Sequence, residues 1–180
     1  VWGGITLVKA EFVLLKAAVD HGPYQHYHLI SGADLPIQTQ EDSRAFFEAN
    51  PDVAIVGGAM QEFNSSNPKL NVRHYPRNND EVMRTIYKAS PLAHPTVMMR
   101  SAIFRNGLKY DERYRTSQDI ALWFDAICAG YKIGNIDDIT LYFRRDDEMF
   151  RRRSRAKAWN EFRIYMNGVR RVYGLLTPKY

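Results

Sequence analysis

Cysteine is almost absent from this 180-residue chain, which contains only Cys128. A single cysteine cannot form a disulfide within the chain, and it cannot supply a cysteine-based zinc site. Long apolar runs are also missing: no stretch approaches the roughly 18 residues that span a bilayer, and no signal-peptide pattern is present. The cysteine count fits a reducing compartment. The chain begins at Val1 rather than at methionine, so we expect a fragment or a trimmed form of a longer protein.

Apolar residues are frequent enough to build a core. They make up 45% of the chain, with 13% aromatic residues, which excludes the composition of a disordered protein. The length suits one domain, or one domain with an appendage. We expect a core over residues 1–154 and a helical, amphipathic extension over residues 155–180.

Positive charge exceeds negative charge by five at neutral pH. This balance suits a phosphate-bearing ligand, an anionic membrane surface or nucleic acid. A local run of basic residues can also be a solvated helix that binds no ligand. Basic residues gather in one span: Arg144, Arg145, Arg151, Arg152, Arg153, Arg155 and Lys157.

Helical and strand spacings alternate along the chain, which favours an α/β sandwich. We expect helices over 5–19, 40–49, 80–89, 120–129 and 156–173, and strands over 27–30, 53–58, 133–135 and 141–144. Residues 62–79 are expected to form a long loop and residues 91–100 an extended segment. Asp80 is expected to cap the third helix, and Ser117 or Asp119 the fourth, which Gly130 ends.

Several motifs follow one another between residues 50 and 154. They are Asn50-Pro51-Asp52-Val53, His94-Pro95 with Val97-Met98 and Arg100, Tyr110-Asp111-Glu112, Gln118-Asp119 with Leu122-Trp123, and Tyr142-Phe143-Arg144. This series resembles the acceptor-site half of a GT-A glycosyltransferase of family two. The resemblance implies a Rossmann-like, three-layer sandwich with a mixed central sheet, and transfer of a sugar from a nucleotide-sugar with inversion.

The first fifty residues carry a different pattern. Val1-Trp2-Gly3-Gly4 is followed by Tyr27-His28-Leu29-Ile30-Ser31-Gly32-Ala33-Asp34-Leu35-Pro36-Ile37. This part resembles the core-2/I-branching N-acetylglucosaminyltransferase family (family fourteen), whose GT-A-like fold works without an Asp-x-Asp motif or an essential metal. The chain therefore looks like a hybrid of two related families that share one reaction class. The sequence contains no uridine-binding segment of the kind with which GT-A enzymes begin, so we expect the first strands of the fold to be missing from it.

Asp119 is the candidate catalytic residue. The family resemblance implies that it deprotonates the acceptor hydroxyl, with Gln118 in place of the usual glutamate. A carboxylate at a helix N-terminus is stabilised in its charged form, and a base must be ionised and aimed. The alternative is a plain capping residue worth about 1 kcal/mol. Because His94-Pro95 and Trp123 stand in the same order and spacing as in the family motifs, we favour the role of general base for Asp119.

His94 and Trp123 are the aromatic candidates for contact with substrate. An extended segment before Pro95 would let the His94 ring project from a strand end into a cleft, towards the acceptor or a phosphate. A packed histidine is equally compatible with the sequence. For Trp123, packing in the core is favoured over stacking on a sugar.

Asp34 follows a buried strand, where open α/β sheets place ligand-binding groups. It could hold Mn²⁺ or Mg²⁺ on a diphosphate or bond a sugar hydroxyl, although a turn residue before Pro36 is the favoured alternative.

Arg144 and Arg145 end the last expected strand, and a guanidinium there could bind the leaving diphosphate. The alternative is a surface pair with Asp146 and Asp147. Because family two carries several acids where this chain has only Asp34, the arginines are favoured over a cation.

The sequence thus predicts a glycosyltransferase that uses a nucleotide-sugar, a UDP-sugar first of all, and a glycan or lipid-linked acceptor. We expect a role in surface-polysaccharide synthesis in the cytoplasm, at the inner face of the membrane, where the basic span and the amphipathic tail could touch anionic lipid. One alternative is a catalytically inactive domain of the same fold. The other is a basic nucleic-acid-binding module, which no recognisable binding motif supports.

Overall fold

The computed structural model describes residues 5–22, 24–28, 35–36, 40–114, 116–145 and 155–174. Its elements, in chain order, are α1 (Ile5–His21), β1 (His26–His28), β2 (Leu35–Pro36), α2 (Gln40–Ala49), β3 (Val53–Phe63), β4 (Val72–Arg73), α3 (Asn79–Met83), the 3₁₀ helix η1 (His94–Thr96), β5 (Met98–Arg100), α4 (Ser101–Arg105), α5 (Gln118–Cys128), β6 (Lys132–Arg144) and α7 (Arg155–Tyr173). None of the described helices is long and apolar enough to cross a membrane.

The strands form one mixed sheet in the order β1-β5-β3-β6-β2, and β4 pairs with the far end of β3. The long strands β3 and β6 run parallel, from the pair Val53–Lys132 to the pair Phe63–Arg144. The other pairings are antiparallel. Because β3 and β6 share a direction, their carboxyl ends lie at the same edge of the sheet.

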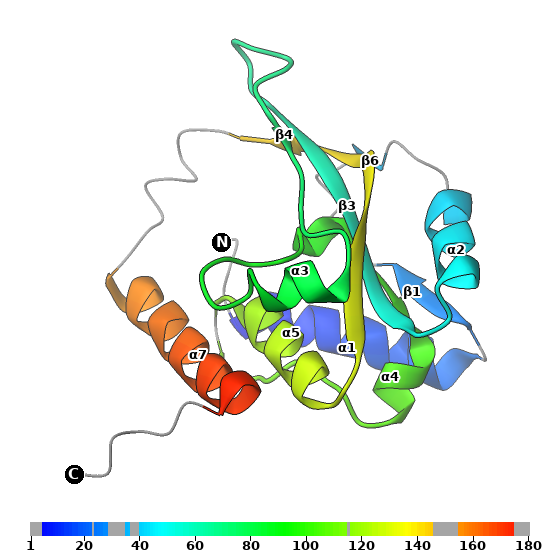
Figure 1. Cartoon of the computed structure of the whole chain (residues 1–180), viewed down its shortest axis with the longest axis vertical. Coiled ribbons are helices and arrows are strands. Elements are labelled where there is room, and N and C mark those ends of the chain that lie inside the picture. Colours follow the sequence, from blue (N-terminus) through cyan, green and yellow to red (C-terminus); the bar gives the residue numbers. More distant parts are fainter. Residues whose placement is uncertain are drawn as a thin grey trace.

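Helices cover both faces of the sheet, as Figure 1 shows, with α2 on one side and α5 on the other. Neighbouring residues of β3 divide between the two faces, since side chains alternate along a strand. Ile55 packs in the larger cluster with the α5 side chains Leu122 and Trp123. Val56 packs with Phe47 of α2 in a second cluster. The expected three-layer α/β sandwich with a mixed sheet is confirmed.

Two strands are longer than the apolar pattern indicated. The expected strands at 133–135 and 141–144 are parts of the single strand β6, and β3 continues to Phe63. The expected loop at 62–79 therefore includes the end of β3 and the short strand β4. Gln61 and Glu62 are buried because their polar groups have partners, so burial continues where the apolar residues stop.

The third helix and the first strand also differ from expectation. Helix α3 is only five residues long, and the side chain of Asn78, not Asp80, accepts a hydrogen bond from the Glu81 N–H as its cap. The expected strand at 27–30 is seen as β1, and Leu29 and Ile30 lie outside the described residues.

Helix α5 begins and ends with residues in the left-handed region. Ser117 at the N-cap has φ 59° and its side chain makes no capping hydrogen bond. Asp119 lies inside the first turn, so of the two expected residues Ser117 occupies the N-cap, although without a capping hydrogen bond from its side chain. At the other end Gly130, with φ 84°, terminates the helix as expected, because glycine adopts this conformation without steric cost.

Helix α7 packs along α5 through one face. Ile164 and Gly168 are buried, and the Tyr165 ring meets Phe124 edge to face with centroids 5.8 Å apart. A β-carbon at position 168 would lie 2.2 Å from Cγ of Phe124. Only glycine permits this close approach of α7 to α5.

We expect Gly168→Ala to destabilise the fold by about 1–3 kcal/mol, the usual cost of overpacking a core. Alanine is the better helix former by about 1 kcal/mol, so a net loss of stability reports the collision with Phe124. Urea unfolding gives the measurement. Asn167→Ala, at the exposed neighbouring position, is the control and should leave stability unchanged or slightly higher. A Gly168→Ala protein as stable as the parent would contradict the packing.

Candidate active site

The amino end of α5 points towards the edge of the sheet where β3 and β6 end. Helix α5 leads through a short turn into the start of β6, and it runs in the opposite direction to that strand. Its first turn, which contains Gln118 and Asp119, is therefore its nearest part to the carboxyl ends of the two parallel strands. In open α/β sheets ligands bind outside this edge.

His94 lies between two aromatic residues on this side of the sheet. It begins η1 rather than standing in an extended segment, because residues 94–96 form a 3₁₀ turn that Pro95 accommodates at its start. Thr96 of η1 accepts a hydrogen bond from the Gly58 N–H at 3.1 Å, which ties the turn to β3. His94 Nε2 lies 2.8 Å from the Tyr110 hydroxyl, and its ring meets Trp123 edge to face at 5.9 Å.

Trp123 is a core residue, as the sequence favoured. Its ring is 0% exposed. The indole N–H is also buried, and within the described part of the chain no group accepts a hydrogen bond from it. A fully enclosed ring presents no face to a sugar in this conformation, so its contribution to the site is to support His94.

Asp119 is half-buried and stands four residues before Trp123 on α5. Residues four apart share a face of a helix, so Asp119 lies one turn before the residue whose ring meets His94. Ser117, two residues earlier, is the only non-glycine residue with positive φ in the described part of the chain. Such a conformation costs about 1–3 kcal/mol and is characteristic of functional sites.

Helix α7 holds the segment that precedes Asp119. Asn160 Nδ2 donates to the Thr116 carbonyl oxygen at 2.8 Å and lies 3.2 Å from the Thr116 hydroxyl. Tyr165 lies five residues further along α7 than Asn160. Burial, then Glu161, then Asp119 raise the pKa of Tyr165 to about 12.

Glu62 is a buried carboxylate at the carboxyl end of β3 that sequence reasoning missed. It is 3% exposed and accepts from Arg145 Nη1 at 2.8 Å and Arg73 Nη1 at 3.4 Å. An isolated carboxylate is costly to bury, and these two guanidinium groups compensate its charge. Its burial was hard to predict from the sequence, because a glutamate at the end of an apolar strand is usually exposed on the protein surface.

Arg145 and Arg144 lie at the end of β6, where the sequence placed them. Arg145 is half-buried against Glu62, and Arg144 is exposed. The alternative partners Asp146 and Asp147 lie outside the described residues. A role for the two arginines in diphosphate binding stays a prediction.

Asp34 also lies outside the described residues, although Leu35, which follows it in the chain, pairs with Tyr142 of β6. Among the described residues there is no cluster of three His, Cys, Asp or Glu side chains that could hold a metal ion.

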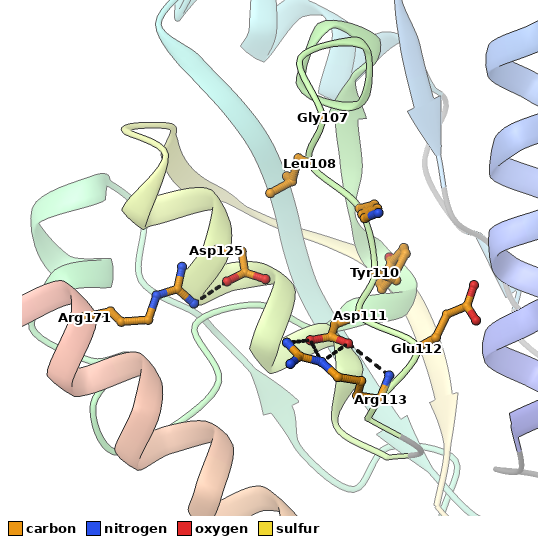
Figure 2. Close-up of a pocket in the computed structure, with 9 residues that line it drawn as sticks. Gly107, Leu108, Tyr110, Asp111, Glu112, Arg113, Asp125 and Arg171 are labelled. Carbon is orange, nitrogen blue, oxygen red and sulfur yellow. Dashed lines mark hydrogen bonds and ion pairs between the residues drawn. The ribbon is translucent and has the colours of Figure 1, made fainter.

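A pocket of about 560 Å³ opens between the segment 107–113, α5 and α7 (Figure 2). Two ion pairs line it: Asp111 with Arg113 at 2.6 Å, and Asp125 with Arg171 at 2.5 Å. Hydrogen bonding from Arg113 is the main cause that lowers the pKa of Asp111. Tyr110 connects this pocket with His94, but neither His94 nor Asp119 lines it.

Residues 1–112, more than half of the chain, match the model of the Core-2/I-Branching enzyme family. The chain belongs to this family. The match continues beyond residue 50, where the resemblance was expected to give way to family two, and ends just after Tyr110-Asp111. Part of the family-two motif series thus lies inside the branching-enzyme match.

Relatives of this branching-enzyme family member are named as glycosyltransferases. An uncharacterized glycosyltransferase of Haemophilus influenzae is 30% identical over 143 residues, which are 76% of this chain and 51% of that protein. The amylovoran biosynthesis glycosyltransferase AmsE of Erwinia amylovora is 22% identical, over 67% of this chain and 43% of its own length. The chain spans about half the length of the curated relatives it matches.

Solved structures support the fold. The glycosyltransferase TarS of S. aureus (residues 1–349) superposes with a TM-score of 0.51 at 16% identity, over 88% of this chain and 50% of that one. At this identity the similarity concerns the fold alone. The GT-A-like architecture expected from the sequence is therefore confirmed.

We expect Asp119→Asn to lower the pKa of Tyr165 from about 12, because it removes one of the negative charges that raise it. Titration of tyrosinate absorbance gives the measurement, and Tyr165→Phe identifies the transition. The folded-state pKa of Tyr165 lies above the ordinary value of 10.0. Its contribution to the stability of the fold is therefore fully present below pH 10 and is lost as the pH rises from there to about 12, where the phenol ionises in the folded state as well.

Asp125→Asn is the matched control, since Asp125 lies on the same helix and is not a cause of the shift. An unchanged Tyr165 titration in Asp119→Asn would show that the charge of Asp119 does not reach the Tyr165 hydroxyl.

Proposed function

We propose that this protein is a glycosyltransferase that transfers a sugar from a nucleotide-sugar to a hydroxyl of a glycan or lipid-linked acceptor, with inversion at the anomeric carbon. The observation that carries the proposal is the position of Asp119. It stands in the first turn of α5, after the strained Ser117 and four residues before Trp123, whose ring meets His94.

The comparisons support a nucleotide-sugar as donor. TarS, which shares the fold, has been solved in complex with UDP and in complex with UDP-GlcNAc. AmsE is named for amylovoran biosynthesis, which supports a polysaccharide product. A UDP-sugar is therefore the first donor class to test, and surface-polysaccharide synthesis is the proposed setting.

The proposed reaction is a single displacement. The Asp119 carboxylate takes the proton of the acceptor hydroxyl as its oxygen attacks the anomeric carbon. The bond from that carbon to the diphosphate oxygen breaks, and the nucleoside diphosphate leaves with the bonding electrons. His94, held by Tyr110 and Trp123, would orient the acceptor, and Arg144 and Arg145 would balance the charge on the leaving group.

Asp119→Asn should lower turnover by about two to four orders of magnitude, the usual contribution of a general base. The measurement is release of UDP from a UDP-sugar with acceptor present. Asparagine keeps the shape of the side chain, so the thermal unfolding temperature should change little. Asp125→Asn is the control and should retain activity within about threefold. Equal activity in Asp119→Asn and the parent would refute the assignment.

The arginines can be tested through donor affinity. Arg144→Ala with Arg145→Ala should weaken binding of a UDP-sugar by about tenfold or more, since charge-assisted contacts to phosphate are strong. Arg145→Ala should also destabilise the fold, because it removes the nearer of the two guanidinium groups that compensate the buried Glu62 carboxylate.

Lys16→Ala with Arg44→Ala is the matched control, since it removes the same net charge from exposed sites on α1 and α2. Donor affinity that persists in the arginine variant and disappears with a chelator would favour a cation instead.

A further inference from the structure

Helix α7 carries a second apolar face, directed away from the core. Trp159, Phe162 and Met166 are 63%, 52% and 57% exposed. Their spacing of three and four residues places them in one stripe along the helix, and the rings of Trp159 and Phe162 stack with centroids 5.5 Å apart. We call these three residues the aromatic stripe.

The aromatic stripe is not the face that fixes α7 to the protein. Ile164 and Gly168 lie on the opposite side of the helix and pack against α5, where Asn160 and Arg171 make polar contacts. Figure 1 shows α7 at the periphery of the molecule, beside α5. The stripe therefore remains exposed while α7 is docked.

Basic side chains lie beside the stripe. Between residues 155 and 173 the helix has five basic residues and one acid, Glu161. Arg163 and Arg170 are exposed, and within the described part of the chain neither forms an ion pair with an acidic side chain. By helical spacing they flank the stripe on one side, as they lie one position after Phe162 and four after Met166.

We propose that α7 docks the protein on an anionic lipid surface, with the aromatic stripe at the boundary of the acyl chains and Arg163 and Arg170 among the headgroups. Tryptophan and phenylalanine on one side of a helix with arginine beside them are the composition of interfacial helices. A second copy of the chain fits this face less well, because a twofold contact through the stripe would bring the arginines of the two copies together.

Vesicle flotation tests the proposal with the 180-residue chain, without donor or acceptor, so its outcome is independent of the proposed function. Vesicles of phosphatidylcholine with phosphatidylglycerol at about 30 mol% should bind the protein at least tenfold more tightly than phosphatidylcholine alone, since each arginine near an anionic surface contributes appreciably. Raising the salt concentration should weaken binding, because surface charge is screened.

Two variants separate the apolar and the charged contributions. Trp159→Ser with Phe162→Ser, and independently Arg163→Gln with Arg170→Gln, should each weaken binding by about tenfold or more. Val13→Ser with Leu14→Ser is the apolar control, at sites 62% and 70% exposed on α1. Lys16→Gln with Arg44→Gln is the charge control. Both controls should bind within about threefold of the parent.

Fluorescence locates the stripe directly. Trp123 is already enclosed, so a blue shift on addition of anionic vesicles that disappears in Trp159→Phe would place Trp159 in the lipid interface. Failure to bind anionic vesicles would overturn the proposal, as would equal losses in the controls and the α7 variants. A dimer that Trp159→Ser with Phe162→Ser dissociates, with no vesicle binding, would assign the stripe to a second copy instead.

Discussion

The parallel pairing of β3 with β6 is the constraint on which the site depends. Parallel strands cannot be joined by a tight turn, so the chain must leave the end of β3 and return to the start of β6. Everything between residues 64 and 131 belongs to that connection, including η1, Tyr110 and α5. The pairing thus determines that α5 runs back along the sheet with Asp119 at the end nearest the carboxyl edge. The His94–Trp123 contact fastens two parts of this connection to each other.

The elements that the sequence predicted well are those in which burial and apolar character coincide. Ile55 and Val56 are apolar and buried on opposite faces of the sheet, so a central strand could be recognised. Glu62 is equally buried, but its partners Arg73 and Arg145 lie far along the chain. Hydropathy cannot reveal a charge that is compensated by residues distant in sequence, which is why β3 was expected to end too early.

The residues of the candidate site also divide into those that the sequence predicted and those that it did not. His94 and Trp123 were singled out separately from a family resemblance, and the contact between their two rings, which the structure shows, was not predicted. The role of Tyr110 as the hydrogen-bonding partner of His94 was not expected, although Tyr110 was part of a recognised motif. The left-handed conformation of Ser117 was also missed, because serine gives no sign of positive φ in a sequence. Asp34 lies outside the described residues, so this part of the prediction is untested.

Helix α7 connects the proposed catalytic residue with the proposed membrane surface. The Asn160 side chain of α7 donates a hydrogen bond to the carbonyl oxygen of Thr116. At Gly168 the helix approaches Phe124 so closely that a side chain at this position would collide with the ring. These contacts fix the rotation of α7 about its own axis. The same rotation determines which side chains face outward, because helical residues cannot turn independently of one another. Packing around Asp119 and exposure of Trp159 and Phe162 are therefore two consequences of one docking geometry. A substitution that rotated α7 to cover the stripe would also release Thr116, and with it the segment that leads into Asp119.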